Sequence, residues 1–259
     1  MPIIHASAMG FWSASAELRD KPREAEVLAG FAKEEAAKIL ILFDIVRCPE
    51  KLVGGRLNKL IARFYGHLER LIYAQLSEWW FTDVADLRKA VEPLRKAHDL
   101  EGNMGEYIVP NDVLYRRESK LYADVEAYED GTPVWNAPVV YPSGFPARMP
   151  AVVQVVEAMA ACGMFTLMGL QAAAEVWGQV EFQERETLHD AERLTQELVA
   201  RLIAESLPTK SANHDHVGAL YRHWPLPMYN VELDPILVTL EELKAEQDRL
   251  LWAEIGDSW

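Results

Sequence analysis

Two long stretches in the first third of the chain carry an apolar residue at every third or fourth position, which is the pattern of a helix with one buried face. They predict helices over residues 23–46 and 56–79. The stripe of the first helix is Leu28, Phe31, Glu35, Ile39, Leu42 and Val46. Further helices are predicted over residues 83–97, 150–177, 183–206 and 234–255. The chain is therefore predicted to be mainly α, an antiparallel helical bundle followed by C-terminal helices.

The middle of the chain has a different character. Residues 112–124 are compatible with a short helix, and residues 125–140 carry β-type residues around a turn at 129–131. Prolines then recur every four to five positions up to residue 150, which forbids helix and favours an extended loop. We expect a helical domain over residues 10–206, with this Pro-rich loop and short β-hairpin at 125–150 as an insertion. Residues 207–259 form a second part, a loop followed by an acidic helix.

The charge of the chain limits its partners. Its 259 residues hold 26 Lys and Arg against 40 Asp and Glu, a net charge of −14. Residues 151–259 carry most of this excess, with seven basic and 18 acidic residues. A chain of this charge is not a general nucleic-acid coat. A local basic run between residues 47 and 70 could meet a phosphate backbone, or it is simply a solvated helix face.

The cysteine content and the hydropathy of the chain indicate the cellular compartment in which the protein is expected. The two cysteines, Cys48 and Cys162, are too few for a disulfide scaffold or a structural zinc site without histidines. The longest apolar tract, residues 158–170, is shorter than the about 20 residues of a membrane span. We expect no membrane segment and a cytoplasmic protein.

Three residues form the candidate catalytic set. Glu35 interrupts an apolar stripe, so its carboxylate needs a cation or a donor. Arg63 and His67 share a face of the next predicted helix, which would bring them to Glu35 if the two helices are antiparallel neighbours. His67 would act as an acid or base and Arg63 would stabilise phosphate charge. The alternative is a structural ion pair at the edge of the core. Glu34 is expected to point elsewhere and to pair with Lys38.

Cofactor motifs are sparse. The chain has neither of the common Gly-rich phosphate loops and no G-x-S-x-G elbow, so no cofactor is predicted. His214, His216 and His223 have the residue type of metal ligands but are expected in a loop, so no metal ion is assigned.

Three segments resemble the AbiV family of abortive-infection proteins. Residues 25–42 are similar to its apolar helix with Glu-Glu-x-x-Lys, and residues 64–70 are similar to its next helix, with a histidine and a basic residue three positions later. The segment from Arg117 to Asp124, followed by Asp130-Gly131, Trp135 and Pro138, is similar to a third family landmark.

The resemblance implies a HEPN-like helical bundle, a homodimer and a role in phage defence. Many HEPN proteins are metal-independent ribonucleases whose arginine and histidine are separated by four to six residues. Here Arg63 and His67 are separated by three, and no Arg–His pair in the chain has the family spacing.

Two functions follow as hypotheses. The first is a defence effector that acts on RNA or translation, as an endoribonuclease using Arg63, His67 and Glu35. Its nucleic-acid contacts would be Arg70, Arg116, Arg117 and Lys120. The second is a non-catalytic module that binds a basic protein partner or the ribosome through its acidic C-terminal part, with a phage or neutralising protein as a further partner. In that case, residues 207–259 should be dispensable for the fold.

Overall fold

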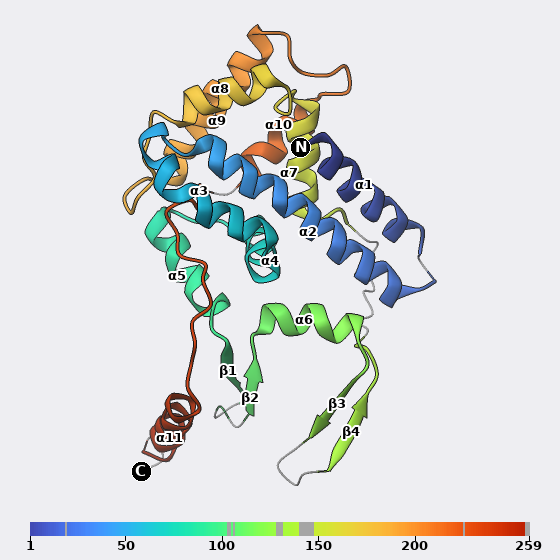
Figure 1. The fold of residues 1–259 in the computed structure, drawn as a ribbon, viewed down its shortest axis with the longest axis vertical. Coiled ribbons are helices and arrows are strands. Elements are labelled where there is room, and N and C mark those ends of the chain that lie inside the picture. The colour runs from blue at the N-terminus through green and yellow to red at the C-terminus, as the bar shows by residue number, and fades with distance from the viewer. Residues whose placement is uncertain are drawn as a thin grey trace.

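The chain folds into a body of packed helices with two small hairpins at one end (Figure 1). This computed structural model describes residues 1–18, 20–102, 105, 107–127, 132–139, 148–224 and 226–256. Its first helices are α1 Pro2–Glu17, α2 Pro22–Arg47, α3 Glu50–Tyr65, α4 His67–Leu76, α5 Val84–Leu94 and α6 Asp112–Leu121. The later ones are α7 Ala151–Ala161, α8 Leu167–Trp177, α9 Leu188–Ala204, α10 His214–His223 and α11 Leu240–Gly256. The prediction of a mainly helical protein is confirmed.

Helix α2 is the centre of the packing. It contacts α1, α3, α4, α6, α7 and α8. Consecutive residues along it are fully buried, including Ala36, Ala37, Ile39, Leu40 and Ile41. The predicted stripe therefore covers only part of its buried surface, because neighbours enclose α2 on several sides. Helix α1, which no apolar pattern in the sequence predicts, packs along α2.

Two helices expected to be continuous are broken. The helix predicted over residues 56–79 divides into α3 and α4 at Gly66, whose backbone is extended. The helix predicted over residues 150–177 divides into α7 and α8 near Gly163. Gly163 has a φ of +80°, and a Cβ there would lie 2.3 Å from the carbonyl oxygen of Leu207. This turn therefore requires glycine.

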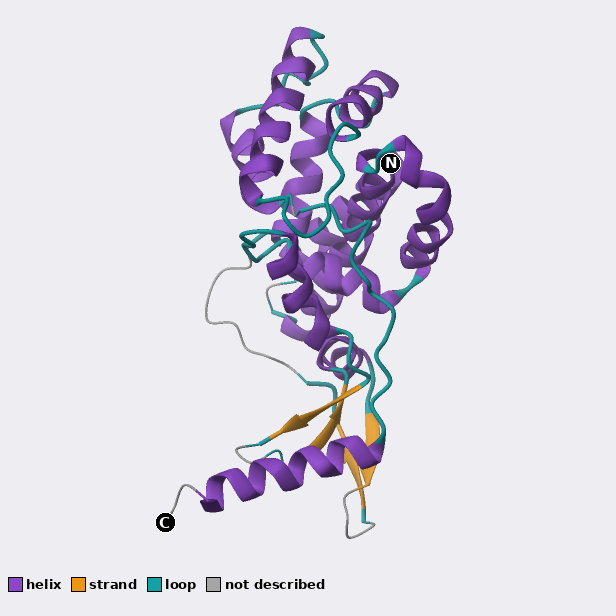
Figure 2. Cartoon of the chain, turned by 90° about the vertical axis from the view of Figure 1, so that its left-hand side faces the viewer, coloured by secondary structure: helices purple, strands orange, loops and turns teal. Residues whose placement is uncertain are grey.

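The strands are short and lie at the end of the molecule away from most helices, together with α11 (Figure 2). β1 His98–Glu101 pairs antiparallel with β2 Tyr107–Pro110, and β3 Asp124–Ala127 pairs with β4 Pro133–Asn136. The second pair is the predicted hairpin, although its expected turn at 129–131 lies outside the described residues. Of the predicted Pro-rich segment at 125–150, residues 140–147 also lie outside them. Helix α11 contacts β1, and Gln247 donates to the carbonyl of Gly105 at 2.7 Å.

The C-terminal part does not behave as one unit. The expected loop 207–230 contains α10, which packs against α7. After it, residues 226–236, the C-terminal strap, run along α3 and α5, whose arginines donate to strap carbonyls. Leu226, Met228, Tyr229, Val231 and Leu233 of the strap are buried in the common core. Two buried side chains hold the strap: Arg63 donates to the carbonyls of Met228 and Val231, and Asp44 accepts from the Met228 amide. The expectation that residues 207–259 are dispensable for the fold conflicts with this packing.

A buried ion pair lies under the strap. Asp44 and Arg47 are both fully buried and hydrogen bonded to each other. The Tyr73 hydroxyl donates to Asp44 at 2.5 Å. The Arg47 guanidinium lies 4.9 Å from the ring of Trp177 and 4.7 Å from that of Trp224. Burial, and then the nearby Asp44 charge, hold the pKa of Tyr73 well above its usual range, so its hydroxyl stays a donor.

Among the described residues, no helix is both long enough and apolar enough to cross a bilayer.

Candidate functional site

Four charged or titratable side chains from three helices converge at one point. Glu34 of α2 is at the centre and is 4% exposed. Its Oε1 lies 2.6 Å from Arg117 Nε of α6, and its Oε2 lies 2.7 Å from His67 Nδ1 and 3.5 Å from Arg70 Nη1 of α4. The buried carboxylate is thus paired on both oxygens, as a charge at this depth requires.

The break at Gly66 creates this arrangement. Because α3 ends there, its last carbonyl groups need other donors. Arg70 provides them: its Nε donates to Gly66 at 2.9 Å and its Nη2 to Tyr65 at 3.1 Å. Arg70 is thereby held beside His67, the first residue of α4, and both side chains face Glu34.

The contacts of His67 decide which ring nitrogen is available. Its Nδ1 lies 2.7 Å from Glu34 Oε2 and 3.1 Å from Arg70 Nη2. A guanidinium only donates, so Nδ1 would have to lack a proton to bond Arg70 and carry one to bond Glu34. The shorter, charge-assisted contact favours Nδ1–H donating to Glu34. Nε2 is then the nitrogen that can exchange a proton with a group outside, and the side chain is 52% exposed.

The ionisation of Glu34 follows from competing effects. Burial raises the pKa of this carboxyl, but hydrogen bonds from Arg117 and His67 and the charges of Arg117 and Arg70 lower it more, so the pKa lies below its ordinary value. Glu34 is therefore ionised at neutral pH, and the carboxylate is available to orient His67.

This shift predicts a pH-dependent stability. A carboxyl whose pKa is lower in the folded than in the unfolded chain stabilises the fold above its unfolded pKa of about 4.3 and loses that contribution as pH falls through the folded pKa. Glu34→Gln should therefore lower the free energy of unfolding by about 2 kcal/mol at pH 7, in the range for hydrogen bonds to charged groups. The difference from wild type should shrink below about pH 4.

Urea unfolding between pH 3 and pH 8 measures this difference. Glu35→Gln is the matched control, because Glu35 is half-buried and pairs with Lys38 at 2.5 Å. That variant should stay within about 1 kcal/mol of wild type throughout. A Glu34→Gln effect that does not change with pH would contradict the assigned ionisation.

An open cleft exposes this cluster to solvent. It has a volume of about 260 Å³. It is lined by Phe11, Phe31, Glu34, Glu35, His67, Arg70 and Arg117. Two arginines face the buried carboxylate of Glu34, and Glu35 is neutralised by Lys38, so the cleft has an excess of one positive charge with His67 neutral. The cleft can therefore attract an anionic group and exchange a proton with it.

The prediction chose the wrong one of two neighbouring glutamates, Glu34 and Glu35. Glu34, and not Glu35, contacts His67, and Glu35 instead takes the contact with Lys38 that we expect for Glu34. The stripe of α2 placed Glu35 on its buried face. The face that meets α4 and α6 lies beside that stripe, and Glu34 points there.

Arg63 does not join His67. It is 2% exposed and donates to the strap carbonyls of Met228 and Val231. The predicted Arg63–His67 pair depends on one continuous helix, and the break at Gly66 turns the two residues apart. Arg70 takes the position beside His67 instead.

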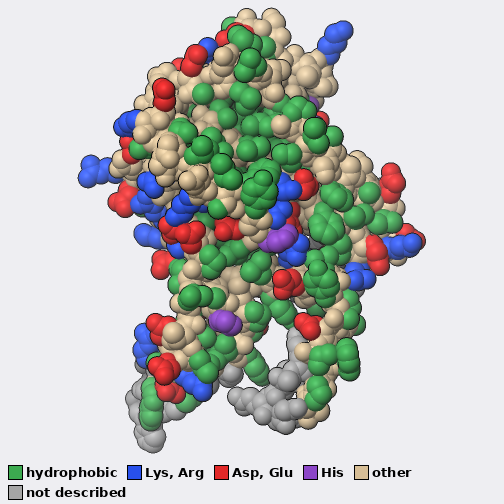
Figure 3. Space-filling view, viewed as in Figure 1, with side chains coloured by type: hydrophobic (Ala, Val, Ile, Leu, Met, Phe, Trp, Pro, Cys, Tyr) green, Lys and Arg blue, Asp and Glu red, His purple; other side chains and the backbone are tan. Residues whose placement is uncertain are grey.

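Of the predicted nucleic-acid contacts, Arg70 and Arg117 lie in the cleft. Arg116 pairs with Asp112 at 2.7 Å on the exposed side of α6, and Lys120 lies 3.1 Å from Glu26 of α2. The basic run at 47–70 does not form a surface patch, because Arg47 and Arg63 are buried and Lys59 pairs with Glu232. Figure 3 shows acidic and basic side chains intermingled across the middle of this face.

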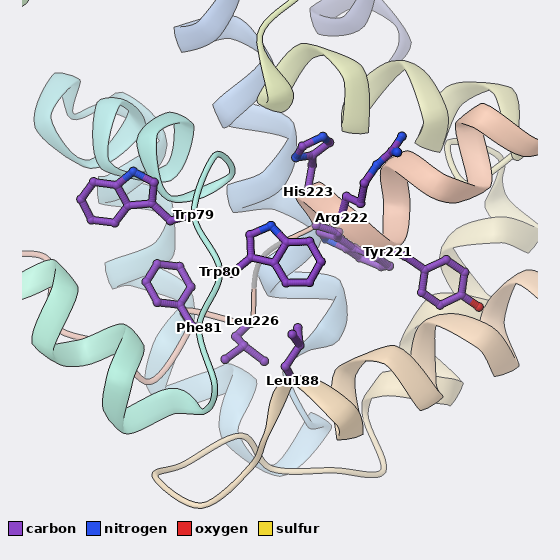
Figure 4. Close-up of a pocket in the computed structure, with 9 residues that line it drawn as sticks. Trp79, Trp80, Phe81, Leu188, Tyr221, Arg222, His223 and Leu226 are labelled. Carbon is purple, nitrogen blue, oxygen red and sulfur yellow. The ribbon is translucent and has the colours of Figure 1, made fainter.

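A second cavity lies between the segment after α4, the end of α10 and the start of α9 (Figure 4). Trp79, Trp80, Phe81 and Tyr221 line it together with His223. Its volume of about 20 Å³ accommodates about one water molecule, so it is not a substrate site.

The three candidate metal ligands are dispersed. His214, His216 and His223 belong to α10 and not to the expected loop. His216 Nδ1 accepts from the Asn213 amide at 3.2 Å, and His223 Nδ1 lies 3.1 Å from the Ser77 carbonyl. The part of the chain that the structure describes groups no three His, Cys, Asp or Glu side chains in a metal-binding arrangement.

Phe11, Phe31 and Glu34 line the cleft but are not among the predicted site residues, and Phe31 is predicted only as part of the apolar stripe of α2. Glu34 carried a signal, since a Glu-Glu pair on a mostly apolar helix leaves two candidates for the buried position. Phe11 lies on a helix that no pattern indicated. Comparison with family models, curated proteins and solved structures finds no match to this chain.

Proposed function

We propose that the cleft between α1, α2, α4 and α6 cleaves RNA by acid–base chemistry, with His67 as the base. The observation that carries this proposal is the contact between Glu34 and His67 Nδ1 beside two arginines. A carboxylate on Nδ1 sets the tautomer that leaves Nε2 as a proton acceptor, which is the arrangement of an oriented general base.

The reaction requires few protein groups. His67 Nε2 takes the proton of a ribose 2′-hydroxyl as its oxygen attacks the adjacent phosphorus. The bond from phosphorus to the 5′-oxygen breaks, and the leaving oxygen takes a proton from water. The products are a 2′,3′-cyclic phosphate and a 5′-hydroxyl, and His67 then returns its proton to solvent. Arg117 and Arg70 offer donors to the charge that develops on the phosphate.

The resemblance to the AbiV and HEPN proteins extends the proposal. It adds a HEPN-like bundle, a homodimer, a cytoplasmic location and a role in abortive infection through RNA or translation. The charge of −14 disfavours a broad RNA-binding surface and by itself favours the non-catalytic alternative. RNA would be held at the cleft and not over a broad basic surface, because counterion release requires clustered positive charge.

The test is RNA cleavage by purified protein in the presence of EDTA. Wild type should produce fragments with 2′,3′-cyclic phosphate ends, and His67→Asn should lower the rate at least about a hundredfold. His189→Asn is the matched control, because His189 is exposed on α9 and does not line the cleft. Cleavage that persists in His67→Asn, or an inactive wild type, would contradict the proposal.

A second candidate is the non-catalytic binding module. It is favoured by α11, which lies away from the helical body and exposes Leu250, Leu251 and Trp252 (Figure 1). In that case the protein would stop cell growth through a partner held on α11. A chain that ends at residue 238 would then lose this effect, whereas His67→Asn would keep it.

A further inference from the structure

Two phenylalanines form a wall of the cleft that acid–base chemistry does not use. Phe11 of α1 and Phe31 of α2 lie with ring centroids 5.5 Å apart and planes inclined by 45°. Both are half-buried, and both line the cleft together with its polar side chains. Phosphate and ribose are polar, so neither requires an aromatic wall.

We infer that Phe11 and Phe31 form a stacking subsite for one nucleobase of the substrate, beside the ribose on which His67 acts. This inference rests on the proposed function and adds to it the residues that hold the base. Every nucleobase has a π-face, and stacking on an aromatic side chain is tolerant of base identity. A base within a duplex is already stacked, so the subsite selects an unpaired one.

The geometry places the base next to the reacting group. Phe31 precedes Glu34 by three residues on α2, so the two side chains share a face of that helix. Glu34 in turn holds His67 at 2.7 Å. A base against Phe31 therefore belongs to the nucleotide whose ribose lies nearest His67. The cleft volume of about 260 Å³ lies just below the about 300–1,000 Å³ of typical small-molecule sites, so the cleft holds no more than about one nucleotide unit.

The wall is fixed before any ligand arrives. α1 packs along α2, and His5 Nε2 of α1 lies 2.6 Å from Glu157 Oε2 of α7. The Phe11 ring is thus carried by a helix that is held at two sides. A preformed aromatic surface lowers the ordering cost of binding.

The test couples a change in the protein to a change in one base. The probe is a fluorescein-labelled hexanucleotide of 2′-O-methyl adenosine, which lacks the reacting hydroxyl, and a set of six variants each with one abasic position. Fluorescence anisotropy measures Kd for each. At one position, loss of the base should weaken binding to wild type about tenfold, and Phe11→Leu should weaken binding of the intact probe about as much. The two losses together should be no larger than one alone, because both remove the same contact.

Controls separate stacking from folding and from surface contact. Phe11→Tyr keeps the aromatic face and should bind like wild type. Trp80→Ala removes an aromatic residue that is 64% exposed and lies outside the cleft, and should have no effect. Additive losses, a weakened Phe11→Tyr or a dependence on Trp80 would each overturn the inference.

The two proposals fail separately. The probe cannot be cleaved, so its binding does not depend on catalysis. RNA cleavage without coupling to Phe11 would remove the subsite and keep the ribonuclease. Coupling at one base without any cleavage would keep the subsite and remove the catalytic proposal.

Discussion

A chain that ends at residue 206 is expected not to fold, whereas a chain that ends at residue 238 should fold with little change. Truncation at residue 206 removes α10 and the C-terminal strap. With them it removes core side chains of Leu220, Trp224, Leu226, Met228, Tyr229, Val231 and Leu233. Burial of each such side chain contributes about 1.5–3 kcal/mol. Together they match or exceed the about 5–15 kcal/mol by which a typical domain is stable.

Hydrogen bonding adds to this loss. Without the strap, the buried guanidinium of Arg63 loses its two acceptors at Met228 and Val231, and Asp44 loses the Met228 amide. Buried donors without acceptors are costly. Truncation at residue 238 keeps the strap through Ile236, whose backbone hydrogen bonds to Arg95 and Ala97. It removes only α11, which contacts β1.

Circular dichroism and thermal unfolding of both truncations measure the contrast. The chain ending at 238 should lose only the helical signal of α11 and should unfold within a few degrees of the full chain. The chain ending at 206 should show no cooperative transition. Cooperative unfolding of the chain that ends at residue 206 would show that residues 1–206 form an independent domain.

The second large effect is expected at the ion pair under the strap. Asp44→Ala should lower the free energy of unfolding by about 3–5 kcal/mol, because it leaves the Arg47 charge in a buried site without its carboxylate. Both side chains are 0% exposed, so solvent cannot screen the change. Three hydrogen bonds to Asp44 disappear at the same time, from Arg47, Tyr73 and Met228.

Urea denaturation at pH 7 measures this loss, and Tyr73→Phe separates its parts. That variant removes the hydroxyl donor and keeps the ring, so it should cost about 1 kcal/mol. If Asp44→Ala cost no more than Tyr73→Phe, the buried charge pair would contribute nothing beyond one hydrogen bond.

The long helices could be predicted from the sequence because their buried faces repeat at helical spacing. α2, predicted over residues 23–46, is Pro22–Arg47, and α5 begins after Asp83, whose side chain accepts from the Asp86 amide. The breaks were less visible. Gly66 and Gly163 interrupt helices whose apolar pattern continues on both sides, so periodicity alone predicts one helix.

The candidate site shows the same division. His67, which the sequence offers as a catalytic residue, lines the cleft, and so do Arg70 and Arg117, which it offers as nucleic-acid contacts. Glu35 and Arg63 are each predicted from helical spacing within their own helix. Their partners were decided by two neighbours that spacing does not describe: the packing of α4 and α6 against α2, and the strap that captures Arg63.

The spacing of apolar residues by itself determined that this chain is helical and where most of its helices lie. The sequence also showed that a histidine and several basic residues gather in the segment that forms α3 and α4. Tertiary structure alone decided which carboxylate is buried, which arginine meets the histidine and that side chains of α10 and of the C-terminal strap belong to the core. The physical reason is that a helical period reports which side of one element is apolar. The partner of a buried charge depends on elements that are distant in the chain, and a buried charge must find such a partner wherever the fold supplies it.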